Sequence, residues 1–141
     1  MIAGIIRPIS LCIIKNEDKL LVMDGYDPKK DQSFFRLLGG GIELGERSEE
    51  ALKREFQEEL ETGLENIKFI TTLENIFTFD GEQGHEIVMV FQADLTNKEL
   101  YQKDSMDIID SKDKHKALWQ KISDFKEKKL ILYPDNILEY I

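Results

Sequence analysis

Three glutamates in the middle of the chain offer the clearest chemistry. Glu55, Glu58 and Glu59 stand at spacings i, i+3 and i+4, and on a helix these spacings place them along one edge, within an arc of roughly 100°. Each like-charged pair costs roughly 0.2–0.5 kcal/mol. A hard divalent cation such as Mg²⁺ or Mn²⁺ removes that cost, because carboxylate oxygens are its preferred ligands. The spacing therefore predicts a metal site on the edge of a helix.

The residues around these glutamates suit the same chemistry. Arg54 neighbours them and can pair with Glu58 or with Glu46 from the preceding loop, which would fix the orientation of a carboxylate. Glycines at 39–41 and 45 allow the backbone to approach closely, and a carbonyl there could be a further metal ligand. A site that combines carboxylates, a cation and glycine backbone close to the ion suits the cleavage of polyphosphates. In that reaction the ion neutralises the charge of the phosphates, and a carboxylate orients or deprotonates water.

A helix rich in glutamate is usually only a solvated face, but the wider spacing favours a site. The segment 40–59, GGIELGERSEEALKREFQEE, resembles the Nudix box. Its pattern is Gly, five residues, Glu, seven residues, then Arg-Glu-aliphatic/aromatic-any-Glu-Glu-any-Gly-aliphatic. The positions that match are Gly40, Glu46, Arg54, Glu55, Phe56, Glu58 and Glu59.

The end of the box departs from the family pattern. The family glycine falls on Glu61 and the final aliphatic position on Thr62, whereas Gly63-Leu64 supplies the same pair two residues later. We therefore predict a helix that runs half a turn longer before its C-cap.

The resemblance implies an activity and roles for the matching residues. Nudix enzymes use Mg²⁺ or Mn²⁺ to cleave a pyrophosphate bond in nucleoside diphosphates linked to another group. By this resemblance Glu58 and Glu59 are the principal metal ligands, and the Gly40 carbonyl joins them. Glu55 is a further ligand or the general base.

Within the same resemblance, Glu46 and Arg54 brace the loop against the helix. The predicted catalytic residues are thus Glu55, Glu58 and Arg54.

Residues outside the helix are candidates for substrate binding, together with Glu46. Arg36, on the strand that enters the glycine loop, is a candidate phosphate contact, with a surface ion pair as the alternative. Glu86 is a candidate carboxylate outside the box, although an ordinary surface acid is the more common case. His85 beside it could contact a phosphate or base, although a strand-end histidine is more often structural. Other acids, which are more often simple surface charges, are Glu99, Asp104 and Asp107. Aromatic residues that could stack on a nucleobase, although such residues are usually core, are Tyr26, Phe34, Phe35, Phe77, Phe79, Tyr101 and Trp119.

The patterning around the box predicts the elements that must position it. Alternating apolar residues indicate a strand over 9–14 that is covered on both faces. Ser48 is a favourable N-cap for a helix reaching Leu60 with Ala51, Leu52 and Phe56 on its buried side. The other predicted strands are 20–23, 33–38, 67–79, 85–95 and 117–122, with loops over 25–32 and 96–116 and a tight turn at 80–84. The loop over 96–116 has room for one helical turn. A helical segment is predicted at 123–128, and a C-terminal helix with Pro134 at its first position.

Length and composition bound the fold class. The 141 residues suit one domain over 1–141, with α+β structure. The resemblance implies the Nudix fold, an α/β/α sandwich with a central mixed β-sheet. A single cysteine, Cys12, excludes an internal disulfide framework and favours the cytoplasm.

Charge and hydropathy indicate which partners to expect. A net charge of −9 argues against binding nucleic acid or an anionic membrane, and no apolar run is long enough to span a membrane. The resemblance to the Nudix family implies a small nucleotide-type substrate, and we expect a monomer or homodimer. The leading hypothesis is a metal-dependent Nudix pyrophosphohydrolase. The alternatives are a non-catalytic Nudix-fold nucleotide-binding or sensor module, and an acidic adaptor whose helix presents charge to a partner.

Overall fold

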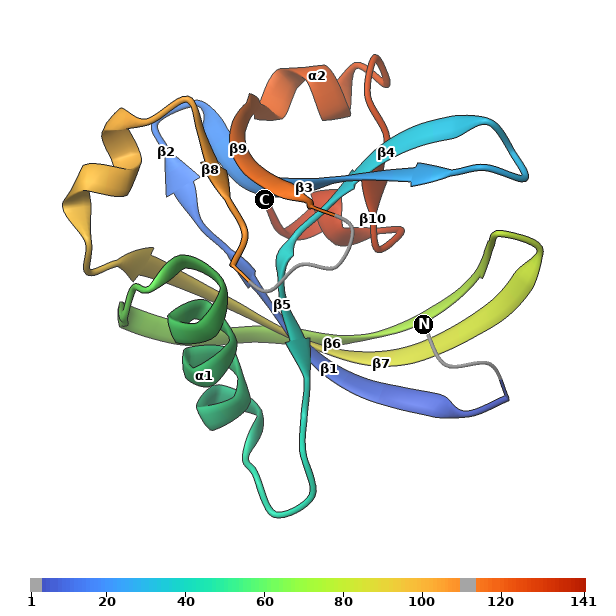
Figure 1. Cartoon of the computed structure of the whole chain (residues 1–141), viewed down its shortest axis with the longest axis horizontal. Coiled ribbons are helices and arrows are strands. Elements are labelled where there is room, and N and C mark those ends of the chain that lie inside the picture. The colour runs from blue at the N-terminus through green and yellow to red at the C-terminus, as the bar shows by residue number, and fades with distance from the viewer. Residues whose placement is uncertain (1–3, 110–113) are drawn as a thin grey trace.

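Strand β1 (Ile6–Ile13) lies inside one sheet, between β5 (Leu38–Gly41) and β7 (Glu82–Leu95), and is buried from Ile9 onward (Figure 1). In this computed structural model, which describes residues 4–109 and 114–141, alternate β1 side chains enter two different hydrophobic clusters. Ile9, Leu11 and Ile13 belong to one cluster, and Cys12 belongs to the other. Because successive side chains of a strand point to opposite faces, this arrangement confirms the prediction of a strand covered on both sides.

Two mixed sheets form the body of the molecule. The first has the order β5-β1-β7-β6, in which only β1 and β7 run parallel. Its strands are β5 (Leu38–Gly41), β1, β7 (Glu82–Leu95) and β6 (Leu64–Phe79). The second has the order β10-β4-β3-β9-β8, with β2 paired to β3, and its only parallel pair is β10 and β4. Its strands are β10 (Leu132–Tyr133), β4 (Gln32–Arg36), β3 (Lys19–Asp27), β9 (Lys116–Lys121), β8 (Ser105–Asp107) and β2 (Lys15–Asn16). The mixed α+β architecture agrees with the predicted Nudix fold.

Helix α1 (Ser48–Leu60) packs on β1 and β5 through its apolar stripe. Ala51, Leu52, Phe56 and Leu60 are buried, as the sequence pattern predicts. The predicted N-cap is wrong by one residue, since Arg47 holds that position without a side-chain cap. Ser48 is already helical and its carbonyl accepts a hydrogen bond from Ser10 Oγ (2.8 Å), which ties the start of the helix to β1.

The end of α1 corrects the prediction of a longer helix. The helix stops at Leu60, and Glu61 adopts the left-handed conformation (φ 51°) that usually favours glycine. Its amide donates to the Gln57 carbonyl (3.1 Å). The C-cap therefore lies at the family glycine position itself, with a glutamate in place of the glycine.

Several other predicted boundaries shift. The strand predicted over 33–38 is divided into β4 and β5 around Leu37, and the loop predicted over 25–32 shortens to 28–31 because β3 extends to Asp27. The turn after β6 consists only of Asp80 and Gly81, both with positive φ. This is the geometry that suits a two-residue hairpin connection.

The C-terminal third contains more structure than expected. The segment predicted as a loop over 96–116 carries a 3₁₀ turn, η1 (Lys98–Gln102), and strand β8, while residues 110–113 lie outside the described part. The predicted helical segment is α2 (Ile122–Lys126). The helix expected from Pro134 is wrong, because Asn136 takes a left-handed conformation (φ 70°) and only a 3₁₀ turn, η2 (Ile137–Tyr140), follows.

Candidate active site

The predicted acidic edge of α1 faces the glycine strand β5. The Glu55 side chain is 19% exposed and the Glu58 side chain is 56% exposed. Arg54 Nη1 donates to Glu55 Oε1 (3.0 Å) and to Glu58 Oε2 (3.3 Å). The guanidinium therefore links two of the three predicted ligands.

Arg54 also fixes the loop before the helix, as predicted. Its Nε and Nη2 donate to the two carboxylate oxygens of Glu46 (2.8 and 3.0 Å), and Nη2 donates to the Gly41 carbonyl (2.9 Å). The bonds to Arg54 hold the pKa of Glu46 below its usual range, and the same pair raises the pKa of Arg54. A bidentate pair of this kind sets geometry as well as energy, so the glycine loop is held against the helix.

Gly40 lies directly against the Glu55 carboxylate. A Cβ on Gly40 would overlap the carboxylate carbon and both oxygens of Glu55. The absence of a side chain is therefore what allows backbone and carboxylate to approach each other here.

Glu59 is the most buried of the three glutamates. Burial, followed by repulsion from neighbouring Glu55, raises the pKa of Glu59 from 4.5 to about 8, while Arg36 acts to lower it. Glu59 Oε1 is buried and has no hydrogen-bond partner. A buried oxygen without a partner is costly, so this atom is suited to an added cation or proton.

The donor chemistry fits a hard divalent cation. Carboxylate oxygens and a close backbone carbonyl are the ligands that Mg²⁺ and Mn²⁺ prefer, and Glu59 Oε1 lacks any other partner. Among residues 4–109 and 114–141, however, no three His, Cys, Asp or Glu side chains are grouped closely enough to hold an ion. Since Arg54 engages both Glu55 and Glu58, a cation would have to compete with the guanidinium for them.

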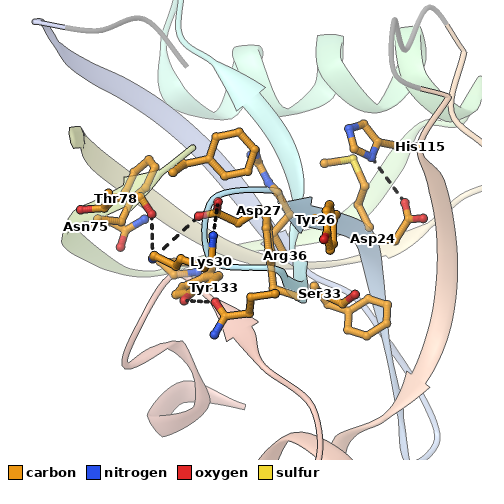
Figure 2. Close-up of a pocket in the computed structure, with 18 of the residues that line it drawn as sticks. Asp24, Tyr26, Asp27, Lys30, Ser33, Arg36, Asn75, Thr78, His115 and Tyr133 are labelled. Carbon is orange, nitrogen blue, oxygen red and sulfur yellow. Dashed lines mark hydrogen bonds and ion pairs between the residues drawn. The ribbon is translucent and has the colours of Figure 1, made fainter. Parts of the chain in front are cut away.

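A cavity of about 810 Å³ opens between the two sheets (Figure 2). Its lining comes from β1, β3, β4, β6, β7 and β10 and includes Arg36. Arg36 also lies near enough to Glu59 to influence its pKa. Within the described residues it makes no ion pair or hydrogen bond, so the predicted alternative of a surface ion pair is not observed. Arg36 is therefore a cavity residue whose charge also acts on the acidic edge of α1.

Glu86 lies on the wall of the same cavity and is 9% exposed. Its contacts are long: Arg7 Nη1 is 3.8 Å from Oε2, and Asn75 Nδ2 donates to Oε1 at 3.4 Å. The register places Arg7, Glu86 and Asn75 in one row across β1, β7 and β6. This polar row is available to a ligand in the cavity.

Aromatic rings form much of the remaining lining of the cavity. Phe34 meets Phe79 and Tyr133 edge-on, with ring centroids 6.1 and 5.3 Å apart, and Tyr26, Phe35 and Phe77 also line the cavity. For two of the stacking candidates the core alternative holds, since Tyr101 and Trp119 stack on each other in the core (5.3 Å).

Sequence reasoning missed Tyr133, Arg7 and Asn75 as cavity residues. Period-two patterning could have placed Asn75 beside Phe77 on one strand face, but nothing local indicates that Tyr133 meets β4. The remaining candidates lie elsewhere. Glu99, Asp104 and Asp107 are exposed, and His85 lines a separate hollow with its Nε2 buried and unpaired.

Comparisons with known proteins agree with this geometry. The NUDIX domain family model matches residues 6–140. The MutT NUDIX hydrolase from Burkholderia pseudomallei superposes with a TM-score of 0.61 at 21% identity, covering 85% of this chain and 86% of that protein. A NUDIX hydrolase from Nitrosomonas europaea gives 0.61 at 17% identity, with 94% and 84% covered. The E. coli ORF135 protein gives 0.55 at 20% identity, with 95% and 86% covered. A search of curated proteins found no significant match.

Proposed function

Because the chain belongs to the NUDIX domain family, we propose that it is a metal-dependent pyrophosphohydrolase acting by water attack on a nucleoside diphosphate-linked substrate. The observation that carries the proposal is the continuity of the site. The Glu55–Glu59 edge faces the glycine strand, and Arg36, which lines the cavity between the sheets, lies near enough to Glu59 to lower its pKa.

Mg²⁺ or Mn²⁺ would be held by the helix edge. Glu58 and Glu59 are the proposed principal ligands, and Glu55 and the Gly40 carbonyl are the proposed further protein ligands. Such a cation neutralises phosphate charge and acidifies water when bound. The buried Glu59 Oε1 without a partner is the direct support for a ligand at this place.

The chain's own residues supply the remaining steps. Glu55, held by Arg54 and packed on Gly40, is placed to orient water or accept its proton. Arg54 keeps Glu46 and the Gly41 carbonyl in position, so that the loop cannot drift from the helix. Arg36 is the proposed substrate phosphate contact, because its guanidinium lines the cavity, has no hydrogen bond or ion pair among the described residues, and lies near enough to Glu59 to lower its pKa.

The cavity supports a nucleoside moiety as the bound group. Ligand sites of this kind combine apolar and aromatic walls with a few polar groups that fix orientation. Here Phe34, Phe79 and Tyr133 supply the rings, and Glu86 with Asn75 supplies the polar edge. The volume of about 810 Å³ accommodates such a group.

The test is release of phosphate or pyrophosphate from nucleoside triphosphates, dinucleoside polyphosphates, ADP-ribose and other nucleotide sugars. Each reaction is run with Mg²⁺, with Mn²⁺ and with chelator. We expect metal-dependent cleavage of one class, and loss of about a hundredfold or more in Glu58→Gln, with an unchanged circular dichroism spectrum. Glu49→Gln, an exposed acid on the same helix, is the matched control. A fully active Glu58→Gln would refute the site, and nucleotide binding without cleavage would instead favour the sensor alternative.

A further inference from the structure

The four arginines of the chain fall into two groups. Arg47 is an exposed partner of Glu50, and Arg54 is fully engaged by carboxylates and a carbonyl. Arg7 and Arg36 both line the cavity, and within the described residues neither guanidinium donates a hydrogen bond. The two arginines with free donors are thus the two that face the space for a ligand.

The guanidinium of Arg7 has only one weak acidic partner. Its side chain is 32% exposed, and its one ion pair, with Glu86, is 3.8 Å long. A guanidinium carries five N–H donors in a planar fork that matches phosphate geometry. Partly buried donors gain free energy when an acceptor arrives, so the site favours an added anionic group.

The glycine strand puts Arg7 opposite the acidic edge of α1. Successive positions in a strand point to opposite faces, and Gly40 and Gly41 follow this rule. The side of Gly40 that would carry a Cβ is filled by the Glu55 carboxylate. A Cβ on Gly41 would lie 2.9 Å from Arg7 Nη2. The two glycines, Gly40 and Gly41, therefore separate Arg7 from Glu55, and the cavity lies on the same side of β5 as Arg7.

We infer that Arg7 binds a phosphate group of the substrate on the cavity side of β5 and so selects phosphorylated ligands over neutral ones. The inference rests on the proposed function for the identity of the ligand. It concerns a different residue and face from the metal-binding glutamates. Glu86 acts on Arg7 as a positioning residue, since their pairing directs the guanidinium across β1 and β7.

The test measures binding in the presence of EDTA, where the proposed cleavage cannot proceed. Guanosine and GDP, and adenosine and ADP, are titrated calorimetrically into the wild-type chain, Arg7→Gln and Arg47→Gln. The last variant makes the same charge change at an exposed position away from the cavity. Of GDP and ADP, we expect the one that binds the wild-type chain more tightly to bind more tightly than its own nucleoside. Arg7→Gln should reduce the affinity for that diphosphate about tenfold and leave the affinity for the nucleoside unchanged. Arg47→Gln should match the wild type.

Two further variants distinguish phosphate binding from a structural role. If Arg7 only neutralises Glu86, the double variant Arg7→Gln/Glu86→Gln recovers wild-type diphosphate affinity, and that recovery overturns the inference. Arg7→Lys should retain part of the diphosphate preference, because the charge remains while the planar fork is lost. The inference also fails if the wild-type chain does not bind the diphosphate more tightly than the nucleoside. It fails as well if Arg7→Gln weakens binding of the nucleoside as much as binding of the diphosphate, or if Arg7→Gln and Arg47→Gln bind the diphosphate with the same affinity.

These outcomes are separable from those of the cleavage assay. Arg7-dependent diphosphate binding without metal-dependent cleavage sustains the Arg7 site and rejects the hydrolase. Metal-dependent cleavage by a chain whose preference for the diphosphate does not depend on Arg7 supports the hydrolase and rejects the Arg7 site.

Discussion

At the level of single residues, Glu59 links the candidate site to pH. Its pKa is raised to about 8, chiefly by burial, from an ordinary value of 4.5. Between these values the folded chain retains a proton that the unfolded chain has released. The free energy of unfolding in EDTA should therefore fall as pH rises from about 4.5 to about 8.

Denaturant unfolding across this pH range checks the prediction. Glu59→Gln carries no titrating group at this position, so its stability should fall less steeply than that of the wild type. Glu58→Gln is the control, since its carboxylate is more than half exposed and its loss should leave the slope nearly unchanged. Equal slopes in wild type and Glu59→Gln would contradict the assigned environment.

A second residue-scale prediction concerns Gly40. In Gly40→Ala the new Cβ would overlap the Glu55 carboxylate, which is the mobile end of a side chain and can swing away. We expect a loss of about 1 kcal/mol or less in stability but at least about tenfold in kcat, measured by unfolding and by the metal-dependent assay.

Gly39→Ala provides the contrast to Gly40→Ala. At Gly39 a Cβ would meet the rigid Ser10 carbonyl, and φ is +148°. Substitution there should disrupt folding itself. A Gly40→Ala protein that keeps full activity would show that the position of Glu55 is unimportant.

At the level of elements, the C-terminal end of α1 carries avoidable strain. Glu61 occupies a left-handed conformation with φ 51°, which costs a residue with a Cβ roughly 1 kcal/mol relative to glycine. Glu61→Gly should raise the free energy of unfolding by about 1 kcal/mol without altering turnover, because the side chain is exposed and lies beyond the carboxylates. Glu61→Ala, which removes the charge but keeps the Cβ, should not produce this gain in denaturant unfolding.

The helix and its acidic edge were predictable because their signals are local. Leu52 and Phe56 recur at helical spacing, and the box glutamates keep fixed distances from Gly40. The C-cap was misplaced because a glutamate in the left-handed conformation has no strong signature in sequence. The sequence alone leaves Tyr101 as a candidate for both stacking and the core, because only its partner in the structure, Trp119, distinguishes the two.

Cavity residues required information about pairing between distant strands. Arg7 meets Glu86 only because β1 and β7 run parallel in the observed register. Tyr133 reaches Phe34 only because β10 joins the edge of β4. No spacing along the chain encodes either contact, whereas the box encodes its own geometry within one helix and one loop.

At the level of the whole molecule, the parallel pair of β1 and β7 lies between two regions that we propose act on one ligand. One side of the first sheet carries α1 and its acidic edge, and the other carries Arg7 and Glu86 beside the cavity. In the part of the chain that the structure describes, no helix is long and apolar enough to cross a membrane. The surplus of acidic residues gives a net charge of −9, which makes cation binding a property that affects overall stability.

Divalent cations should therefore stabilise the folded chain in two separable ways. Any salt screens the repulsion of a net charge of −9, whereas a specific site adds RT ln(1 + [L]/Kd) to the free energy of unfolding. We expect Mg²⁺ at a hundred times its Kd to add about 2.7 kcal/mol beyond NaCl of equal ionic strength, seen as a raised Tm in scanning calorimetry and reversed by EDTA. Glu58→Gln should retain the NaCl effect but lose most of the Mg²⁺ increment, because it keeps nearly all of the charge and lacks a proposed ligand. If Mg²⁺ and NaCl were equivalent in the wild type, the acidic edge would be a solvated face and the adaptor hypothesis would gain the support that the metal site loses.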